Sequence, residues 1–263
     1  LSEIKKLTTK KTKCIIVVHM AGYSCEMDKI VKFCKKNNIF LIEDCAHGLG
    51  TMYKKKHVGN FGIAGIFSFY PTKQITTGEG GVVITNNRNL INKVKIIKSI
   101  GLNTPPEKRK IQGLYDVTDL GLNYRLTDFQ AALAIGQMIR YNKNLKKRRE
   151  NAKYYIEKIK KIKELKIQNF DKKHSYFILQ VFFKSKKVRN KILLKFKEQG
   201  IGCSIHYATP VPLMSYYKKK YRLNKKNFVN SVKYGENSIS LPTHQFIKKK
   251  MINTILKVIE NNL

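Results

Sequence analysis

Four side chains that can do chemistry lie near the ends of two predicted strands. Asp44 ends the apolar run IFLIED, and His47 follows it. Ser68 lies near the end of the run IAGIFSF, and Lys73 follows that run. Ligands of parallel sheets bind outside the carboxyl ends of the strands, where the following loops converge. We therefore expect a carboxylate, an imidazole, a hydroxyl and an amine to face one cleft.

Taken one at a time, these residues also have ordinary structural explanations. Most lysines are solvated surface groups, and the chain has 53 lysines and arginines. An aspartate after a strand is often a turn residue, and a single histidine is often a hydrogen-bonded structural residue. The residue types alone therefore leave the chemistry open.

Two other kinds of site fit the sequence less well. A serine hydrolase would need a Gly-x-Ser-x-Gly turn, which Ser68 lacks. A metal site could draw on a set of four residues, but their spacing matches no closed zinc pattern. That set is His19, Asp44, His47 and His57. We predict neither site.

Alternating strands and helices are expected to position the four side chains. Strands are predicted where short apolar runs occur, and helices where apolar residues recur every three or four positions. Such alternation predicts an α/β fold, with a mostly parallel sheet flanked by helices. In order, the predicted elements are a strand at 14–18, a helix through Met27, Ile30, Val31 and Cys34, strands at 39–44, 63–69 and 81–85, and a helix through Leu90, Val94 and Ile97.

A long helix is predicted to begin near Thr127, where Thr127 and Gln130 have the spacing of a capping box. Its apolar stripe consists of Leu126, Phe129, Ala132, Leu133, Gly136 and Ile139. Beyond it the pattern predicts a smaller α+β domain. Its elements are strands at 175–183, 203–207 and 238–242, a helix at 191–199 and a terminal helix. We expect a large domain at 1–160 and a small one at 161–263.

The formal charge of +36 raises the question of nucleic-acid binding. The basic residues are spread along the whole chain, whereas a nucleic-acid site concentrates them on one face or segment. Lys, Asn and Ile are abundant together, as in an AT-rich coding sequence. We therefore expect anionic small molecules, and no specific nucleic acid, as ligands.

The five cysteines and the apolar runs bear on the cell compartment. The cysteines are odd in number and show no paired spacing, so we expect them to be reduced. No apolar run is long enough to cross a bilayer, and the first residues lack the apolar segment of a signal peptide. We expect a soluble, cytoplasmic protein with no membrane partner.

Five separated motifs, in order, resemble the DegT/StrS family of pyridoxal-phosphate-dependent sugar aminotransferases. They are VHMAGYSCEMDKI, LIEDCAHGLG, VGNFGIAGIFSFYPTKQITTGEGGVVIT, LGLNYRLTDFQAALAIGQ and IGCSIHYATP. The resemblance runs from about Thr12 to the C-terminus. It implies the aspartate-aminotransferase type of fold and pyridoxal 5'-phosphate as cofactor.

The resemblance also implies a role for each candidate residue. Lys73 matches the lysine that holds the cofactor as a Schiff base and moves the substrate proton. Asp44 matches the acid that pairs with the pyridine nitrogen, and His47 a position beside the ring. Ser68 matches a phosphate contact. Asn123 matches a residue that reaches the cofactor phosphate of the other subunit, which implies a homodimer with shared active sites.

Two departures from the family pattern concern the substrate. Family members carry an upstream segment with a Gly-Thr phosphate cradle and part of the substrate pocket, so we expect this sequence to be N-terminally incomplete. Pro212 stands where the family usually has a histidine in the substrate region. Recognition of the sugar is thereby left open.

The resemblance predicts transfer of an amino group from glutamate to a nucleotide-linked keto-sugar, in the biosynthesis of surface polysaccharides or aminosugars. One alternative is a sugar dehydratase, a lyase with the same cofactor, but those relatives have histidine in place of Lys73. The other is a basic binding module that keeps the fold without catalysis. Retention of the motifs disfavours it, whereas truncation favours it.

Overall fold

The computed structural model describes residues 1–104 and 106–263. The chain divides into two compact units, Leu1–Asn142 and Lys143–Leu263, which we call unit 1 and unit 2 and describe separately. The division falls inside the long helix α4, Asp128–Ile159. The domain boundary after residue 160, expected from the sequence, stays a prediction.

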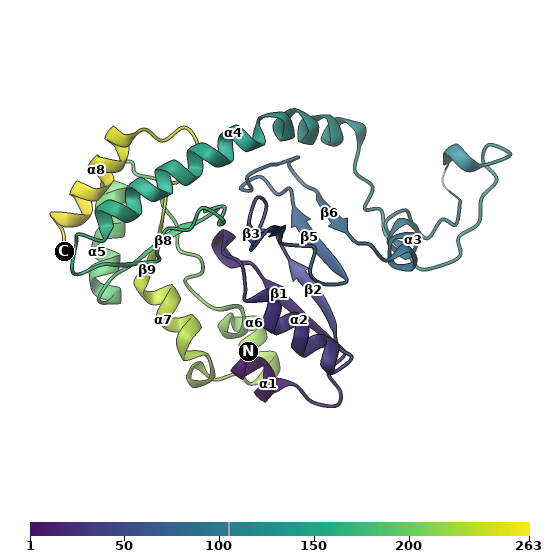
Figure 1. Cartoon of the computed structure of the whole chain (residues 1–263), viewed down its shortest axis with the longest axis horizontal. Coiled ribbons are helices and arrows are strands. Elements are labelled where there is room, and N and C mark those ends of the chain that lie inside the picture. Colours follow the sequence, from purple (N-terminus) through teal and green to yellow (C-terminus); the bar gives the residue numbers. More distant parts are fainter. Residues whose placement is uncertain (105) are drawn as a thin grey trace. The chain divides into compact units, whose positions relative to one another are not determined.

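Unit 1 is built on a four-stranded sheet in the order β1-β2-β5-β6 (Figure 1). The strands are β1 (Cys14–Val18), β2 (Phe40–Asp44), β5 (Ala64–Ser68) and β6 (Gly81–Ile84). The first three run parallel to one another, and β6 runs antiparallel to β5. A parallel neighbour would need a crossover connection, usually a helix, and the segment between β5 and β6 contains none. The predicted mostly parallel α/β sheet is confirmed.

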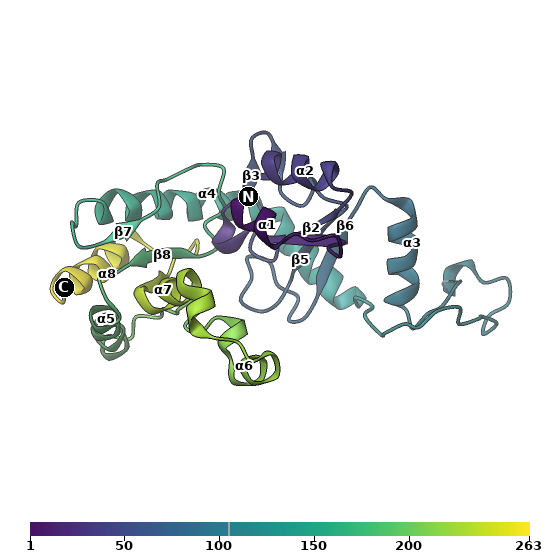
Figure 2. The ribbon, with the colours of Figure 1, turned by 90° about the horizontal axis from the view of Figure 1, so that it is seen from below.

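One face of this sheet is covered by α2 (Met27–Lys36), which lies alongside β1 and β2 (Figure 2). Met27, Ile30 and Cys34 recur at helical spacing, so they share one side of α2. They are buried against Val17 and Leu41 of the sheet. The predicted βαβ unit therefore forms around this core.

The opposite face of the sheet is largely exposed in the described residues. Successive side chains of a strand point to opposite faces, and residues paired in register share a face. Asp44 pairs with Val18 on β1 and with Ile66 on β5, so all three lie on the exposed face. Apolar side chains there are 40% to 62% exposed: Ile16, Val18, Phe40, Ile66 and Val83. Asp44 thus lies on a face that unit 1 leaves open.

Shorter elements complete unit 1. The remaining bounds are α1 (Ser2–Leu7), η1 (Met20–Gly22), β3 (Met52–Tyr53), β4 (Lys56–His57), α3 (Arg88–Ile97) and η2 (Pro106–Lys108). Asn87 caps α3 by accepting the Leu90 N–H at 2.9 Å. The capping box of α4 is confirmed, because Thr127 Oγ1 accepts the Gln130 N–H at 3.2 Å and Gln130 Oε1 accepts the Thr127 N–H at 3.0 Å.

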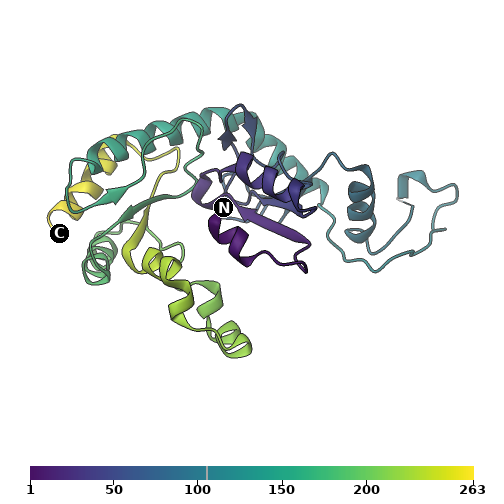
Figure 3. The same cartoon turned by 60° about the horizontal axis from the view of Figure 1, so that its bottom comes forward.

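Unit 2 contains an antiparallel sheet of β7 (Lys166–Ile167), β8 (Leu179–Phe182) and β9 (Ser238–Leu241), of which β7 and β8 lie side by side in Figure 3. Its helices are α5 (Lys186–Glu198), η3 (Val211–Leu213), α6 (Ser215–Tyr221), η4 (Lys225–Phe228), α7 (Val229–Asn237) and α8 (Lys249–Glu260). Leu179 and Val181 of β8 and Ile239 of β9 are buried. These strands and helices make the predicted α+β arrangement.

Five elements of unit 2 differ from what the sequence predicts. Helix α5 begins at Lys186 rather than at residue 191, because Ser185 Oγ caps it by accepting the Val188 N–H at 3.3 Å. The predicted strand at 203–207 is reduced to a bridge between Ser204 and Ser240. Strand β7 and helices α6 and α7 were not predicted.

In the described part of the chain, no helix combines the length and the apolar character that crossing a membrane requires. All five cysteines are free thiols, as the sequence predicts.

Candidate active site

The fold brings Asp44 and Ser68 to the same edge of the unit 1 sheet. Asp44 is the last residue of β2, and Ser68 is the last residue of the neighbouring β5. His47 follows Asp44 by three positions, and Lys73 follows Ser68 by five. Four of the predicted residues therefore come from two adjacent strand ends, as the sequence indicates.

Lys73 is half-buried, and the negative charge of Asp44 influences the pKa of its amine. Burial lowers the pKa of the Lys73 amine, and the negative charge of Asp44 opposes part of that shift. Desolvation disfavours the charged amine, so Lys73 is more readily neutral than a surface lysine. A neutral amine is the form that attacks a carbonyl.

The loop that carries Lys73 is fixed at its base and along its length. The Phe69 N–H donates to the Gly80 carbonyl at 2.9 Å, and the Thr77 N–H donates to the Phe69 carbonyl at 3.0 Å. These bonds close the loop where β5 ends and β6 begins. The Lys73 N–H donates to the Tyr70 carbonyl at 2.9 Å, which makes a tight turn just before the amine-bearing residue.

Two glutamines of α4 clamp the same loop, and the sequence analysis missed their role. Gln137 bonds the backbone of Thr76 twice, accepting its N–H at 3.1 Å and donating to its carbonyl at 2.6 Å. Gln130 donates to the Glu79 carbonyl at 2.8 Å. Both residues lie in the motif LGLNYRLTDFQAALAIGQ. They are seven positions apart and so lie on the same face of α4, but nothing in this spacing indicates that the loop is their partner.

His47 is only 7% exposed, and its ring is held by backbone. The Ala21 N–H donates to His47 Nδ1 at 3.3 Å. A ring nitrogen that accepts a hydrogen bond carries no proton, so the neutral ring has its proton on Nε2. His47 can thus offer an N–H donor from Nε2.

The loop that supplies this N–H, after β1, is strained. Ala21 has a φ of 60° and Gly22 a φ of 90°. The left-handed region costs a residue with a Cβ roughly 1–2 kcal/mol. Thr51 Oγ1 secures the loop by donating to the Gly22 carbonyl at 2.7 Å. Held in this way, the loop fixes the imidazole of His47 near the end of β2.

Glu43, beside Asp44, is a buried carboxylate saturated with donors. Its Oε1 accepts the N–H groups of Phe61 at 2.6 Å and Gly62 at 2.8 Å. Its Oε2 accepts the Gly59 N–H at 2.7 Å and faces His19 Nε2 at 3.1 Å. Burial would raise the pKa of Glu43, but these hydrogen bonds outweigh burial and lower it. Glu43 therefore ties the segment before β5 to β2 and thereby positions Ser68 relative to Asp44.

His19, Glu43 and Cys45 form a cluster in which each residue offers one atom that can bind a metal. These three atoms lie within 4.8 Å of one another. Its ligand atoms are already used, because Glu43 accepts four donors and His19 Nδ1 accepts the Cys25 N–H at 3.2 Å. Burial strongly raises the pKa of the Cys45 thiol, whereas metals bind the thiolate. The cluster is structural. The metal set weighed in the sequence analysis shares only His19 with it.

Ser68 and Asn123 differ in how they relate to Lys73. Ser68 Oγ accepts the Tyr70 N–H at 3.3 Å, which leaves its hydroxyl proton available to an anion. Asn123 pairs with Ser99 in an isolated bridge and is exposed. In the described residues no hydrogen bond joins Asn123 to the other four predicted site residues, so its place in a site stays a prediction.

Comparison with known proteins identifies the relatives of the chain. The model of the DegT/DnrJ/EryC1/StrS aminotransferase family matches residues 1–260. The chain belongs to this family. The predicted family and the enzyme class, a sugar aminotransferase, are thereby confirmed.

Individual relatives are sugar-modifying enzymes. A UDP-4-amino-4,6-dideoxy-N-acetyl-beta-L-altrosamine transaminase of Campylobacter jejuni is 36% identical over 273 residues, covering 97% of this chain and 70% of that protein. A GDP-perosamine synthase of Escherichia coli O157:H7 is 34% identical over 222 residues, covering 84% of this chain and 58% of that protein.

The solved structure of Helicobacter pylori PseC, an aminotransferase involved in the biosynthesis of pseudoaminic acid, superposes with a TM-score of 0.89 at 28% identity. The superposition covers 98% of this chain and 69% of PseC. The predicted fold class is confirmed. The chain spans about 70% of the length of the Campylobacter relative and of PseC.

The residues at the strand ends fit pyridoxal phosphate, the cofactor that the family implies. The donor set contains an amine with a lowered pKa, a carboxylate that acts on it, an imidazole N–H and a hydroxyl. An amine suits the aldehyde of the cofactor, a carboxylate suits its protonated ring nitrogen, and a hydroxyl suits its phosphate. The imidazole N–H is a further donor for the ring.

Proposed function

We propose that this family member is a pyridoxal-phosphate-dependent aminotransferase that moves an amino group from glutamate to a nucleotide-linked keto-sugar. The observation that carries the proposal is that Lys73 is half-buried at the strand ends. Burial lowers the pKa of its amine, and the negative charge of Asp44 opposes part of that shift. Family membership supports the reaction class. The names of relatives support a nucleotide-linked sugar and a role in aminosugar or surface polysaccharide biosynthesis, the latter through a spore coat polysaccharide biosynthesis protein of Bacillus subtilis.

Lys73 is proposed to hold the cofactor and to move a proton. The chemistry that pyridoxal phosphate supplies when bound is an electron-accepting ring conjugated with the reacting nitrogen. In its neutral form, the Lys73 amine would hold the cofactor covalently. The same neutral amine could take a proton from the substrate carbon and return it to a different atom. A lowered pKa suits both tasks.

The other strand-end residues are proposed to hold the cofactor in place. The Asp44 carboxylate stabilises a proton on the ring nitrogen by its opposite charge. His47 donates from Nε2 beside the ring, in the tautomer that the Ala21 N–H selects. The Ser68 hydroxyl donates to the phosphate.

A homodimer is proposed to complete the site with Asn123 of the other chain. Large apolar residues around Asn123 and at the start of α4 are exposed, including Leu120 at 88%, Phe129 at 75% and Ile139 at 80%. Contiguous exposed apolar side chains usually mark an interaction surface. A second copy would cover this stripe and bring its own Asn123 with it.

The amino donor rests on the family resemblance, and the location in the cytoplasm stays a prediction from the sequence. Pro212 in η3 replaces the usual histidine of the substrate region, so the sugar specificity is proposed only as a class. Lys73 argues against the dehydratase alternative, since dehydratase relatives have histidine there.

The first half-reaction tests the proposal. The protein is mixed with pyridoxal phosphate and glutamate, and 2-oxoglutarate is measured in a single turnover. We expect close to one equivalent from the wild type, none from Lys73→Arg, and a normal yield from Lys55→Arg, a change at an exposed lysine. Equal yields from Lys73→Arg and the wild type would refute the role of Lys73, and no yield from the wild type would favour the inactive binding module.

A further inference from the structure

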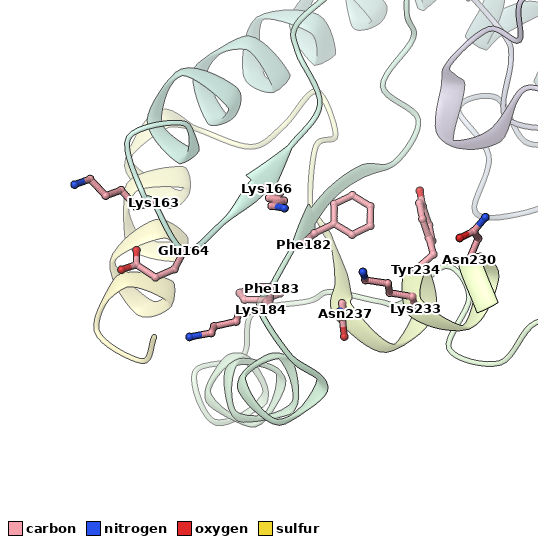
Figure 4. Close-up of a pocket in the computed structure, with 10 residues that line it drawn as sticks. All are labelled: Lys163, Glu164, Lys166, Phe182, Phe183, Lys184, Asn230, Lys233, Tyr234 and Asn237. Carbon is pink, nitrogen blue, oxygen red and sulfur yellow. The ribbon is translucent and has the colours of Figure 1, made fainter.

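Unit 2 has a pocket of its own, with a volume of about 750 Å3 (Figure 4). It lies between the β7–β8 side of the three-stranded sheet and helix α7. Sites for small molecules usually measure roughly 300–1,000 Å3. Lys73 and Asp44 belong to unit 1, whereas all the residues that line this pocket belong to unit 2.

The pocket has an aromatic wall. The rings of Phe182 and Tyr234 meet edge to face, with centroids 5.0 Å apart and planes at 70°. The Tyr234 hydroxyl donates to Gln180 Oε1, and Gln180 Nε2 donates to the His206 carbonyl at 3.0 Å. Both rings are half-buried, so part of each remains open to a planar apolar group.

Helix α7 presents a polar face to this wall. Asn230, Lys233, Tyr234 and Asn237 follow the spacing i, i+3, i+4 and i+7, which places them on one side of the helix. The two amides each offer donors and an acceptor. In Figure 4, Lys233 directs its amine from α7 toward β8.

Lysines dominate the charge of the pocket. Lys166 lies directly opposite Phe182 in the β7–β8 register, so both side chains project from the same face of the sheet. Lys163 and Lys184 lie at the rim and reach outward (Figure 4). Among the described residues, Glu164 is the single acidic residue of the lining.

These lysines are not neutralised by nearby acids. In the described part of the chain, none of the four lining lysines forms an ion pair. The neighbouring Glu236 is engaged instead by Lys225 at 3.0 Å and Lys186 at 3.7 Å. The pocket therefore combines uncompensated positive charge with an aromatic wall, which suits a ligand with a phosphate end and a planar ring.

We propose that this pocket binds a nucleoside diphosphate, with the base against Phe182 and Tyr234 and the phosphates at Lys166 and Lys233. The asparagines of α7 contact the edge of the base. The residues that carry this proposal all belong to unit 2, and none of them is among the residues proposed to act in amino transfer.

Charge-matched variants test the phosphate end. Binding of UDP to the full chain is measured by calorimetry at physiological salt. We expect the double variant Lys166→Glu/Lys233→Glu to lower the affinity for UDP at least about tenfold. The control is Lys191→Glu/Lys250→Glu, which changes two exposed lysines of the same unit outside the pocket, and it should lower the affinity less than about twofold. Equal losses in the two double variants would mean that UDP senses only the net charge, and would overturn the proposal, as would the absence of UDP binding to the wild type.

A second comparison tests the base end. The wild type should bind UDP at least about tenfold more tightly than inorganic pyrophosphate, since a stacked base adds affinity. Phe182→Leu should reduce this ratio to about twofold, whereas Phe246→Leu, at an exposed phenylalanine outside the pocket, should keep it. Equal binding of UDP and pyrophosphate to the wild type would overturn the nucleotide assignment. Attachment of pyridoxal phosphate at Lys73 should be unchanged in all these variants, so failure here is distinct from failure of the proposed function.

Discussion

Replacing Glu43 by glutamine tests how the sheet edge is held together. The carboxylate accepts four donors, two on each oxygen: Phe61 N–H and Gly62 N–H on one, Gly59 N–H and His19 Nε2 on the other. A glutamine amide has one acceptor oxygen, and its NH2 group would face two N–H donors in either orientation. His19 gives no relief, because its Nδ1 already accepts the Cys25 N–H.

The expected cost of Glu43→Gln follows from this count. Hydrogen bonds to a charged group contribute about 1.5–3 kcal/mol each, so losing two costs about 3–6 kcal/mol of unfolding free energy. That is a large part of the stability of a typical domain, about 5–15 kcal/mol. Urea unfolding followed by circular dichroism measures the difference, and Glu198→Gln, at an exposed residue paired with Lys195, is the matched control with little expected effect.

The pH dependence of the same variant gives a second readout. Because the folded pKa of Glu43 is lowered, its contribution is fully present above the pKa of an unfolded glutamate and is lost as pH falls through the folded value. Glu43→Gln should lack this acid-dependent loss. A midpoint shift no larger than that of the control, with an unchanged acid profile, would refute the account of Glu43.

Three further results are expected. Asp44→Asn should slow amino transfer from glutamate at least about a hundredfold, because the ring nitrogen loses its counter-charge; near-normal turnover would exclude that role. Mixing an Asn123→Ala chain with a Lys73→Ala chain should restore partial activity, since each mixed dimer has one intact site; no recovery in verified heterodimers would mean that Asn123 serves its own chain or none. Burial lowers the pKa of His57, whose Nε2 accepts the Gly50 N–H at 2.8 Å. As the pH falls, the unfolded chain therefore protonates this histidine before the folded chain does, and the free energy of unfolding decreases below about pH 6.5. His57→Gln should show a smaller fall, and an identical acid profile would contradict this.

Periodicity and capping account for what could be predicted of the fold. The apolar runs of β1, β2 and β5, the face of α2 and the Thr127–Gln130 box each carry a local signal, and each element lies where that signal puts it. Strand β7 is two residues long and has no such pattern. The start of α5 depended on Ser185, a cap that precedes the apolar positions of the helix.

The candidate site was predictable in part for a related reason. Asp44, His47, Ser68 and Lys73 follow from the rule for the ends of parallel strands, and the family motifs add Asn123 and the roles of all five. Glu43 was not predicted, because an acid within an apolar run gives no sign of the three backbone N–H groups that converge on it from residues 59–62. The two glutamines of α4 bond residues 61 and 51 positions away, and no local pattern encodes those pairings.

The attachment point of the cofactor tests the central claim most directly. The protein is incubated with pyridoxal phosphate, reduced with borohydride and digested, and the labelled peptide is identified by mass spectrometry. We expect one cofactor per chain on the peptide that contains Lys73, no such label in Lys73→Ala, and full labelling in Lys55→Ala. Stoichiometric label on a different lysine, or unchanged labelling of Lys73→Ala, would contradict the account.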